Sequence, residues 1–535
     1  MGQNPIGRKL MLDVILRGGT VVDGTGRPAF VADLGVKDGR IVRVGNLADQ
    51  DAETVLDCVG LHLLPGFIDT HVHSDMALLH DRQHANGLHQ GITTEILGQD
   101  GLSYAPLSQE NLETYAFFNR GLNGYYPDVK LDFRSVSEYL ARMDGSVGVN
   151  VAYNVPHGTV RLEALGFHDA PLTGYPLEKA KALLREAFDQ GAVGFSTGLS
   201  YYPQSFSDTK EMVELCSVAA EYDAPLVIHL RTVPHVGVEL PAVQEALEIG
   251  RRSGCAVHFS HFRTAPGSAG RTQSLVAPLE EAIAHGQRVT AECYPYYSGS
   301  GYPMVCLPPW ANEGGPKAIL ARLADPKLRP ALERGMRNNA AKAEGTFTHV
   351  PSHPEYVGRD FRDVAREEGK TVEGLICDLL LENELDVGYF SNPDGTAQQK
   401  AQMDRDLVWL LNRPYYMCGS DAIPYGRKPH PRAFGTFPRF FRLARENGMS
   451  VENFAYHTSQ LPAKTFGLKD RGILTEGAFA DIVALDYVQT TDQSTYEQGR
   501  RPPKGIQYVL VNGQLAVDEG KVNGILNGRA LRREK

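Results

Sequence analysis

Eight short apolar segments recur along the middle of this 535-residue chain, with helical segments between many of them. Intervening segments such as LEKAKALLREAFDQ and DTKEMVELCSVAAEY have helical periodicity, which is typical of βα units around a parallel sheet. Eight parallel strands are the number that closes a (β/α)8 barrel, so we predict an α/β fold of this TIM type. The eight candidate strands are LLPGFIDT, GITTEILG, VGVNVAYN, AVGFSTG, PLVIHL, CAVHFSH, RVTAECY and PYYMCGSD.

The two ends of the chain differ from the middle. Residues 11–64 and 466–535 contain short alternating strands with glycine turns, which predict a small β-sandwich domain formed from both termini. The barrel is then expected over residues 65–465. Residues 305–410 precede the last strand and are too many for a structureless connection, so we predict an insertion that caps the barrel mouth. Residues 1–10 are expected to be a flexible extension.

Composition and charge exclude several classes of protein. The net charge of -10 comes from interspersed acids and bases without a basic stripe, so we expect no nucleic-acid partner. The chain has neither a run of eighteen apolar residues nor a start like a signal peptide, so we expect no membrane association. Its seven cysteines are scattered without a CxxC pair, which indicates neither a disulfide framework nor a structural zinc knot. We therefore expect a cytoplasmic protein.

Side chains that ligate metals stand at the ends of four of the predicted strands. His71 and His73 end the first strand, and side chains two apart on a strand share a face. His229 ends the fifth strand, His261 the sixth and Asp421 the eighth. Because the active site of such a barrel lies at the carboxyl ends of its strands, these side chains are expected to converge. Imidazole and carboxylate groups bind divalent metals such as zinc, so the pattern predicts a metal centre.

Several longer motifs carry a resemblance to a known family. Over nearly its full length the chain resembles the amidohydrolase superfamily and, within it, the N-acyl-D-amino-acid deacylases. The resemblance implies that His71 and His73 hold one metal position, that His229 and His261 hold the other, and that Asp421 is the catalytic carboxylate. It also implies one or two divalent ions per chain, with zinc the first expectation. The motifs are PGFIDTHVHSD, GITTEILGQDGLSYAP, GAVGFSTGLSYYP, AECYPYYSGSGYPMVCLPPW, GSDAIPYGRKPHPRAFGTFPR and GILTEGAFADIVALD.

One position departs from the family pattern. The family commonly has a bridging cysteine in the loop after the second strand, where this chain reads GQDG and offers Asp100. A carboxylate also bridges metals but is a harder ligand than a thiolate, so the number and identity of the ions stay open. We expect Asp100 to be a shared ligand. Glu95 in the second strand is an alternative ligand, although a structural role is expected for it.

The resemblance also suggests residues that contact the substrate. Tyr294, at the end of the seventh strand, is expected to donate a hydrogen bond to the developing oxyanion. Arg432 matches the position that grips the substrate's α-carboxylate with a guanidinium fork. Tyr201 and Ser300 match further contact positions. For Arg263, two residues after His261, two roles stay open: a substrate contact or a pair with a local acid.

The expected reaction is hydrolysis of a small N-acyl-D-amino acid by a metal-activated water, with Asp421 as general base and acid. Three alternatives stay open: a cyclic-amide hydrolase like hydantoinase or dihydroorotase, a hydrolase of another N-acyl amino acid, and a scaffold protein without catalysis. Cyclic-amide hydrolases use a lysine in the fourth strand, which AVGFSTGLS lacks. A scaffold protein is expected to have lost some ligands, yet this chain has all four histidines and Asp421. The sequence does not predict the oligomeric state.

Overall fold

The computed structural model describes residues 11–231, 240–339 and 343–533, and its core is a parallel sheet of eight strands. Each strand pairs in parallel with the next one of the barrel along the chain, from β6 to β16. The extension predicted for residues 1–10 lies outside the described residues. The barrel strands are β6 (Phe67–Asp69), β7 (Ile92–Leu97), β8 (Asn150–Pro156), β9 (Gly194–Gly198), β10 (Leu226–His229), β11 (Val257–Phe259), β12 (Val289–Cys293) and β16 (Tyr416–Cys418).

The residues that follow β6 and β16 close the sheet into a barrel. Val72 bridges Ala422 in parallel orientation, and the backbone N–H of Asp421 donates to the carbonyl of His71 at 2.7 Å. The predicted (β/α)8 barrel is therefore confirmed. Because the closing hydrogen bonds lie at the carboxyl ends of the strands, they also place Asp421 beside the HxH segment.

The first predicted barrel strand is two strands in the structure. LLPGFIDT divides at Pro65 and Gly66, so that β5 (His62–Pro65) joins the sheet of the terminal segments and only β6 enters the barrel. A Cβ atom at position 66 would lie 2.2 Å from Oγ1 of Thr93, so only glycine fits where the chain passes from one sheet to the other. The prediction of one continuous strand was wrong because the apolar run continues across this break.

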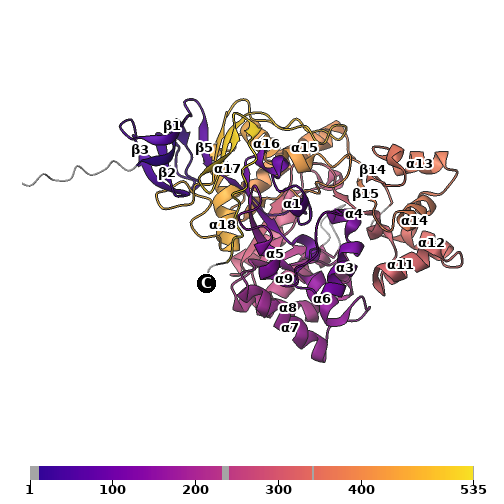
Figure 1. Cartoon of the computed structure of the whole chain (residues 1–535). Coiled ribbons are helices and arrows are strands. Elements are labelled where there is room, and N and C mark those ends of the chain that lie inside the picture. The colour runs from indigo at the N-terminus through magenta and orange to yellow at the C-terminus, as the bar shows by residue number, and fades with distance from the viewer. Residues whose placement is uncertain (1–10, 232–239, 340–342, 534–535) are drawn as a thin grey trace, which may run out of the picture.

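Strands from both ends of the chain form the second sheet, which Figure 1 shows beside the barrel. β5 joins the two ends, since it pairs in parallel with β1 and antiparallel with β17. The strands from both termini thus come together as predicted for the β-sandwich domain, and within the described residues they form one continuous nine-stranded sheet; the bounds of that domain stay a prediction. Its other strands are β1 (Leu12–Val21), β2 (Phe30–Lys37), β3 (Arg40–Gly45), β4 (Ala52–Asp57), β17 (Ile482–Leu485), β18 (Ile506–Val511), β19 (Gln514–Asp518) and β20 (Lys521–Val522).

Helices cover the outside of the barrel (Figure 1). In α7 the buried residues recur at intervals of four, three and one, which gives an apolar stripe that packs on the barrel. Among the described residues, no helix combines the length and the apolar character needed to cross a membrane. The helices are α1 (Ala77–His80), α2 (Ala85–Leu88), α3 (Gln109–Phe118), α4 (Arg120–Asn123), α5 (Val136–Ala141), α6 (His157–Leu165), α7 (Gly174–Asp189), α8 (Thr209–Glu221), α9 (Leu240–Ser253), α10 (Thr272–Ala284), α15 (Ala397–Leu411), α16 (Arg432–Glu446), α17 (Val451–Ala455) and α18 (Leu461–Phe466).

An insertion stands between β12 and β16, as expected, and projects to one side of the barrel (Figure 1). Its last helix in sequence, α15, packs against α10 and α16 and so belongs to the helical layer of the barrel. The exact domain boundaries stay predictions. The insertion contains α11 (Gly315–Ala324), α12 (Arg329–Asn338), α13 (Phe361–Glu367), α14 (Val372–Glu382) and a small sheet of β13 (Ser300–Gly301), β14 (Thr346–His349) and β15 (Gly388–Phe390).

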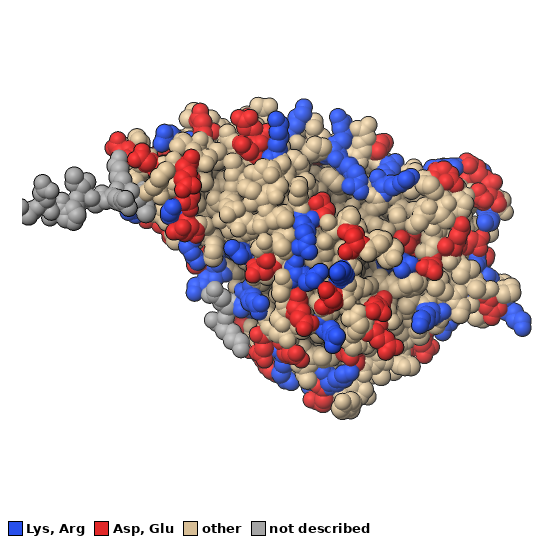
Figure 2. All heavy atoms as spheres, in the orientation of Figure 1, with Lys and Arg blue, Asp and Glu red and all other residues tan. Residues whose placement is uncertain are grey.

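Basic and acidic side chains are interspersed over the face of the molecule shown in Figure 2, which agrees with the mixed charge pattern of the sequence.

Candidate active site

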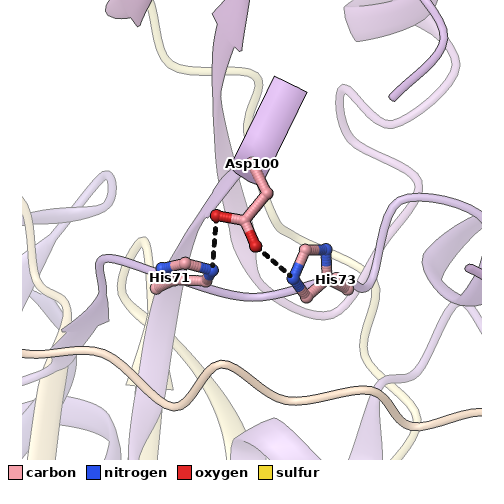
Figure 3. A group of neighbouring side chains, drawn as sticks. All are labelled: His71, His73 and Asp100. Carbon is pink, nitrogen blue, oxygen red and sulfur yellow. Dashed lines mark ion pairs between the residues drawn. The ribbon is translucent and has the colours of Figure 1, made fainter. Parts of the chain in front are cut away.

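All of the predicted metal ligands meet at the carboxyl ends of the barrel strands. His71 and His73 follow β6, His229 is the last residue of β10, and His261 follows β11 by two residues. Asp100 lies in the short 3-10 turn after β7, and Figure 3 shows its carboxylate between the rings of His71 and His73. These residues come from distant parts of the sequence, and barrel closure brings them to one place.

Asp100 and the HxH pair form the first group of ligands (Figure 3). Asp100 Oδ1 lies 3.5 Å from Nε2 of His71, and its Oδ2 lies 3.7 Å from Nε2 of His73. Oδ1 of Asp421 lies 3.6 Å and 3.5 Å from the same two nitrogens. All four side chains are buried. Two imidazole nitrogens therefore face two carboxylates. One of these nitrogens, Nε2 of His71, has no hydrogen-bond partner among the described residues.

Asp100 also belongs to the second group, with His229 and His261. Its Oδ2 lies 3.5 Å from Nδ1 of His229, which in turn lies 2.8 Å from Nε2 of His261. Within each group the ligand atoms lie within 4.8 Å of one another. Ser200 Oγ contacts the other ring nitrogen of His229, Nε2, at 2.9 Å, which leaves Nδ1 for the cluster. The single carboxylate of Asp100 is thus common to both groups.

The chemistry of these groups fits a divalent cation. Nε2 of His71 and Oδ1 of Asp100 are buried and have no hydrogen-bond partner among the described residues, although buried polar atoms are normally paired. Burial disfavours the charged imidazole of His71, but the carboxylates of Asp100, Asp421 and Glu292 outweigh it and raise its pKa to about 10. A metal ion bound in place of that proton would balance the same negative charges. Histidine and carboxylate donors suit zinc in particular.

Asp421 is held by a buried arginine. Nη1 of Arg432 donates to Oδ2 of Asp421 at 2.8 Å, and its Nη2 donates to the carbonyl of Ser300 at 3.3 Å. Burial alone would raise the pKa of Asp421, but Arg432 and His71 keep it well below its usual range. Asp421 is therefore an ionised carboxylate with Oδ2 engaged and Oδ1 directed at the histidines. In this arrangement the guanidinium of Arg432 is hydrogen-bonded to Asp421 and to the Ser300 carbonyl. Its expected contact with the substrate carboxylate stays a prediction.

Tyr294 and Arg263 form a second polar feature beside the histidines. Nη2 of Arg263 donates to the Tyr294 hydroxyl at 3.2 Å. The guanidinium carbons of Arg263 and Arg432 lie 4.5 Å and 4.8 Å from the centre of the Tyr294 ring. Since the Tyr294 oxygen accepts from Arg263, its own proton is available to a group in the cavity. Of the two roles left open for Arg263, the structure gives it this tyrosine as a partner, and no acid pairs with it in the part of the chain described.

All members of the two ligand groups except His71 line a cavity of about 640 Å³, together with Asp421. Its walls include three of the predicted substrate contacts, Tyr201, Ser300 and Arg263, together with Tyr294. The Tyr201 ring lies 4.7 Å from the ring of His229, so it is close to the second ligand group. Arg432 is fully buried behind this lining. The insertion contributes to the same walls through Val305, Glu344, Tyr389, Ser391, Asn392 and Asp394.

Three of the site residues adopt a backbone conformation that is rare outside glycine. Asp100, His261 and Asp421 have φ angles of +54°, +38° and +52°. Around Asp100 this conformation is supported by hydrogen bonds: Gln204 Nε2 donates to the Asp100 carbonyl and the Tyr115 hydroxyl donates to the next carbonyl, both at 2.9 Å. Such backbone persists only where the surroundings fix it, and it is concentrated at functional sites.

Two contacts with the histidines were not predicted from the sequence. Glu292 in β12 accepts from Nδ1 of His71 at 2.8 Å, and Ser200 contacts His229. An acid inside the apolar strand RVTAECY was the available signal for Glu292. Glu95, for which a structural role was expected, pairs with His84 at 2.5 Å.

Two comparisons relate the sequence of this chain to known proteins. A sequence profile described as the amidohydrolase family matches residues 388–517. The N-acyl-D-aspartate deacylase of Alcaligenes xylosoxydans xylosoxydans is 32% identical over 527 residues, which cover 97% of this chain and 95% of that protein.

Two solved structures are similar over nearly the whole chain. The N-acyl-D-glutamate deacylase from Bordetella bronchiseptica, complexed with zinc and a phosphonate inhibitor that mimics the tetrahedral intermediate, has a TM-score of 0.78 at 30% identity. A D-aminoacylase with a binuclear metal centre has a TM-score of 0.78 at 29% identity. Each comparison covers 98% of this chain and 100% of the other.

Proposed function

Because this chain belongs to the D-aminoacylase family of amidohydrolases, we propose that it hydrolyses N-acyl-D-amino acids to a carboxylic acid and a free D-amino acid. The observation that carries the proposal is the convergence of four histidines with Asp100 and Asp421 at the carboxyl ends of the barrel strands, where all of them except His71 line one cavity. The zinc in the related deacylase supports zinc as the metal here. His71, His73, Asp100, His229 and His261 would hold one or two such ions.

When bound at these residues, a divalent metal lowers the pKa of a water molecule and polarises an amide carbonyl. Asp421 accepts the proton of the attacking water at Oδ1, since its Oδ2 is held by Arg432 at 2.8 Å. The same carboxylate then returns the proton to the leaving nitrogen, which departs as the amine of the D-amino acid.

Tyr294 donates its hydroxyl proton to the oxygen that becomes negative as the water adds to the carbonyl. Tyr294→Phe should lower kcat by a factor of roughly 10 to 100, because a hydrogen bond to a charged group contributes about 1.5 to 3 kcal/mol. Steady-state kinetics check this, with metal content unchanged. A variant with the parent kcat would show that Tyr294 only packs beside Arg263.

Arg263 binds the α-carboxylate of the substrate, since its guanidinium lines the cavity whereas that of Arg432 is buried against Asp421. A bidentate pair with a carboxylate is worth about 1.5 to 3 kcal/mol. Arg263→Ala should therefore lower kcat/KM by roughly 10- to 100-fold for N-acyl-D-amino acids but not for amides without the carboxylate. Arg432→Ala should lower the rate for both kinds of amide, because Asp421 loses its partner.

A substrate panel on the zinc-loaded protein provides the measurement. It contains N-acetyl-D- and L-amino acids, matched amides without the carboxylate, and a hydantoin. The D-amino acid derivatives should be the best substrates of the parent protein. Preference for the hydantoin would support the cyclic-amide alternative and overturn the proposal. If Arg432→Ala alone discriminates between amides with and without the carboxylate, Arg432 and not Arg263 is the carboxylate-binding residue.

For the compartment we propose the cytoplasm. All seven cysteines are buried and none forms a disulfide, which suits a reducing environment. Trapping of free thiols in freshly lysed cells tests this, since oxidised cysteines would contradict it.

A further inference from the structure

Glu292 contacts both halves of the metal-ligand cluster. It lies on β12, and its side chain is fully buried. A single oxygen, Oε1, accepts the Nδ1 hydrogen bond of His71 at 2.8 Å and the backbone N–H of His261 at 2.6 Å. His71 belongs to the first ligand group and His261 to the second. One carboxylate oxygen therefore fixes a residue of each group.

The contact with His71 selects the tautomer of its ring. A carboxylate at Nδ1 keeps the proton on that nitrogen, so a cation that replaced the proton on Nε2 would meet the lone pair of that atom. Nε2 is the atom that faces Asp100 and Asp421, at 3.5 Å and 3.6 Å. A carboxylate partner also makes the imidazole a stronger donor to a metal. The contact thus both orients His71 and increases its affinity for a cation.

The contact with His261 supports its unusual backbone. With φ at +38°, His261 lies in a region that is sterically costly for a residue with a Cβ atom. The 2.6 Å hydrogen bond from this N–H to the carboxylate oxygen is short and offsets part of that cost. In this conformation Nε2 of His261 points at Nδ1 of His229, 2.8 Å away.

The other oxygen of Glu292 is confined by the neighbouring strand end. A Cβ atom at Gly419 would lie 2.6 Å from Oε2 of Glu292 and 2.8 Å from the Cβ of His71. Glycine at this position, directly after β16, therefore leaves the space that the carboxylate and the imidazole occupy together. Packing against Gly419 therefore restrains the carboxylate of Glu292 and the side chain of His71, in addition to the two hydrogen bonds of Glu292.

We propose that Glu292 is a positioning residue for both metal positions, acting through the ring of His71 and the backbone of His261. It lines neither the cavity nor the ligand groups, so it touches neither substrate nor metal. The inference rests on the metal centre of the proposed function and goes beyond it by assigning the residue that couples the two halves.

The test measures metal binding directly. Glu292→Gln keeps the size of the side chain but removes the charge, and Glu292→Ala removes both hydrogen bonds. Metal-free parent and variant proteins are titrated with Zn²⁺ against a chelator of known affinity. The dissociation constant should rise 10- to 100-fold in Glu292→Gln. The visible spectrum of the Co²⁺-loaded protein should also change, because the donor strength of His71 and the placement of His261 change.

Glu95→Gln is the matched control. Glu95 is likewise a buried strand carboxylate paired with a histidine, His84, but it lies outside both ligand groups. This variant should lower the Tm of the metal-free protein and leave the zinc affinity and the Co²⁺ spectrum unchanged. If both Gln variants weaken zinc binding equally, Glu292 acts only through general stability and the inference is overturned.

Different results would contradict the metal centre and the role of Glu292. If the parent protein binds neither Zn²⁺ nor Co²⁺, the metal centre and with it the proposed function are wrong. If the parent binds both ions and Glu292→Gln retains the parent affinity and spectrum, only the role of Glu292 is wrong. Should Glu292→Ala fail to fold, Glu292→Gln still decides, because it preserves the packing against Gly419.

Discussion

Asp421→Asn should bind zinc as the parent protein does and lose at least about 10²-fold in kcat. The amide keeps the shape of the side chain, and its oxygen still accepts the hydrogen bond that Arg432 donates at 2.8 Å. An amide cannot accept the proton of the attacking water, however, so general base catalysis is lost while the metal ligands stay in place. Steady-state kinetics together with the metal content per chain check both parts.

Asp386→Asn is the control for this variant. Asp386 is also a buried carboxylate beside a histidine, since its Oδ2 lies 3.2 Å from Nε2 of His349, but it does not line the cavity. Its replacement should leave kcat within about twofold of the parent value, because Asp386 belongs to neither ligand group and does not line the cavity. Near-parent turnover in Asp421→Asn would refute the assignment of the proton to Asp421. Loss of metal in that variant would make Asp421 principally a ligand.

Asp100→Ala should lose zinc and activity together. Its two carboxylate oxygens lie 3.5 to 3.7 Å from ring nitrogens of His71, His73 and His229, so one substitution removes a ligand from both groups. Replacement of a residue that only supports a ligand already costs 10- to 100-fold in metal affinity, so the loss of a shared ligand should exceed about 100-fold. Zinc titration against a chelator measures this.

Asp100→Cys separates the loss of a bridge from a change in its chemistry. A thiolate is a softer ligand than a carboxylate and is the family's usual residue here, so this variant should keep zinc. It should also gain affinity for Cd²⁺ relative to Mn²⁺ when compared with the parent. Undiminished zinc stoichiometry and turnover in Asp100→Ala would show that Asp100 does not bridge the two groups.

The ends of the barrel strands were the part of the site that the sequence could reveal. His71, His229 and Asp421 each follow a short apolar run, and a barrel brings such positions together whatever the intervening chain does. The position of a residue at a strand end does not predict the direction in which a buried arginine side chain points. The direction of the Arg432 side chain depends on its contacts with Asp421 and Ser300, which no local pattern encodes, and its expected contact with the substrate stays a prediction.

Glu292 and the first strand show two further limits of sequence patterns. Glu292 stands in an apolar strand where a carboxylate has no local partner, and its two partners lie 221 and 31 residues away. The apolar run LLPGFIDT has the pattern of one strand because the residues on both sides of the break, 63–65 and 67–69, are all buried. Alternation and apolarity identify strands, whereas assignment to a sheet requires contacts between distant segments.

The terminal sheet also determines the order in which the molecule can be completed during synthesis. β5 pairs with β17, so the backbone hydrogen bonds between Leu64 and Val483 can form only after β17 has been synthesised. At translation rates of about 5 to 20 residues per second, the edge of β5 stays exposed on the ribosome for tens of seconds. During that interval the barrel strands emerge one after another. The first of them, β6, directly follows β5, which still lacks its partner β17. β5 is thus among the first strands to be made and among the last to be fully paired.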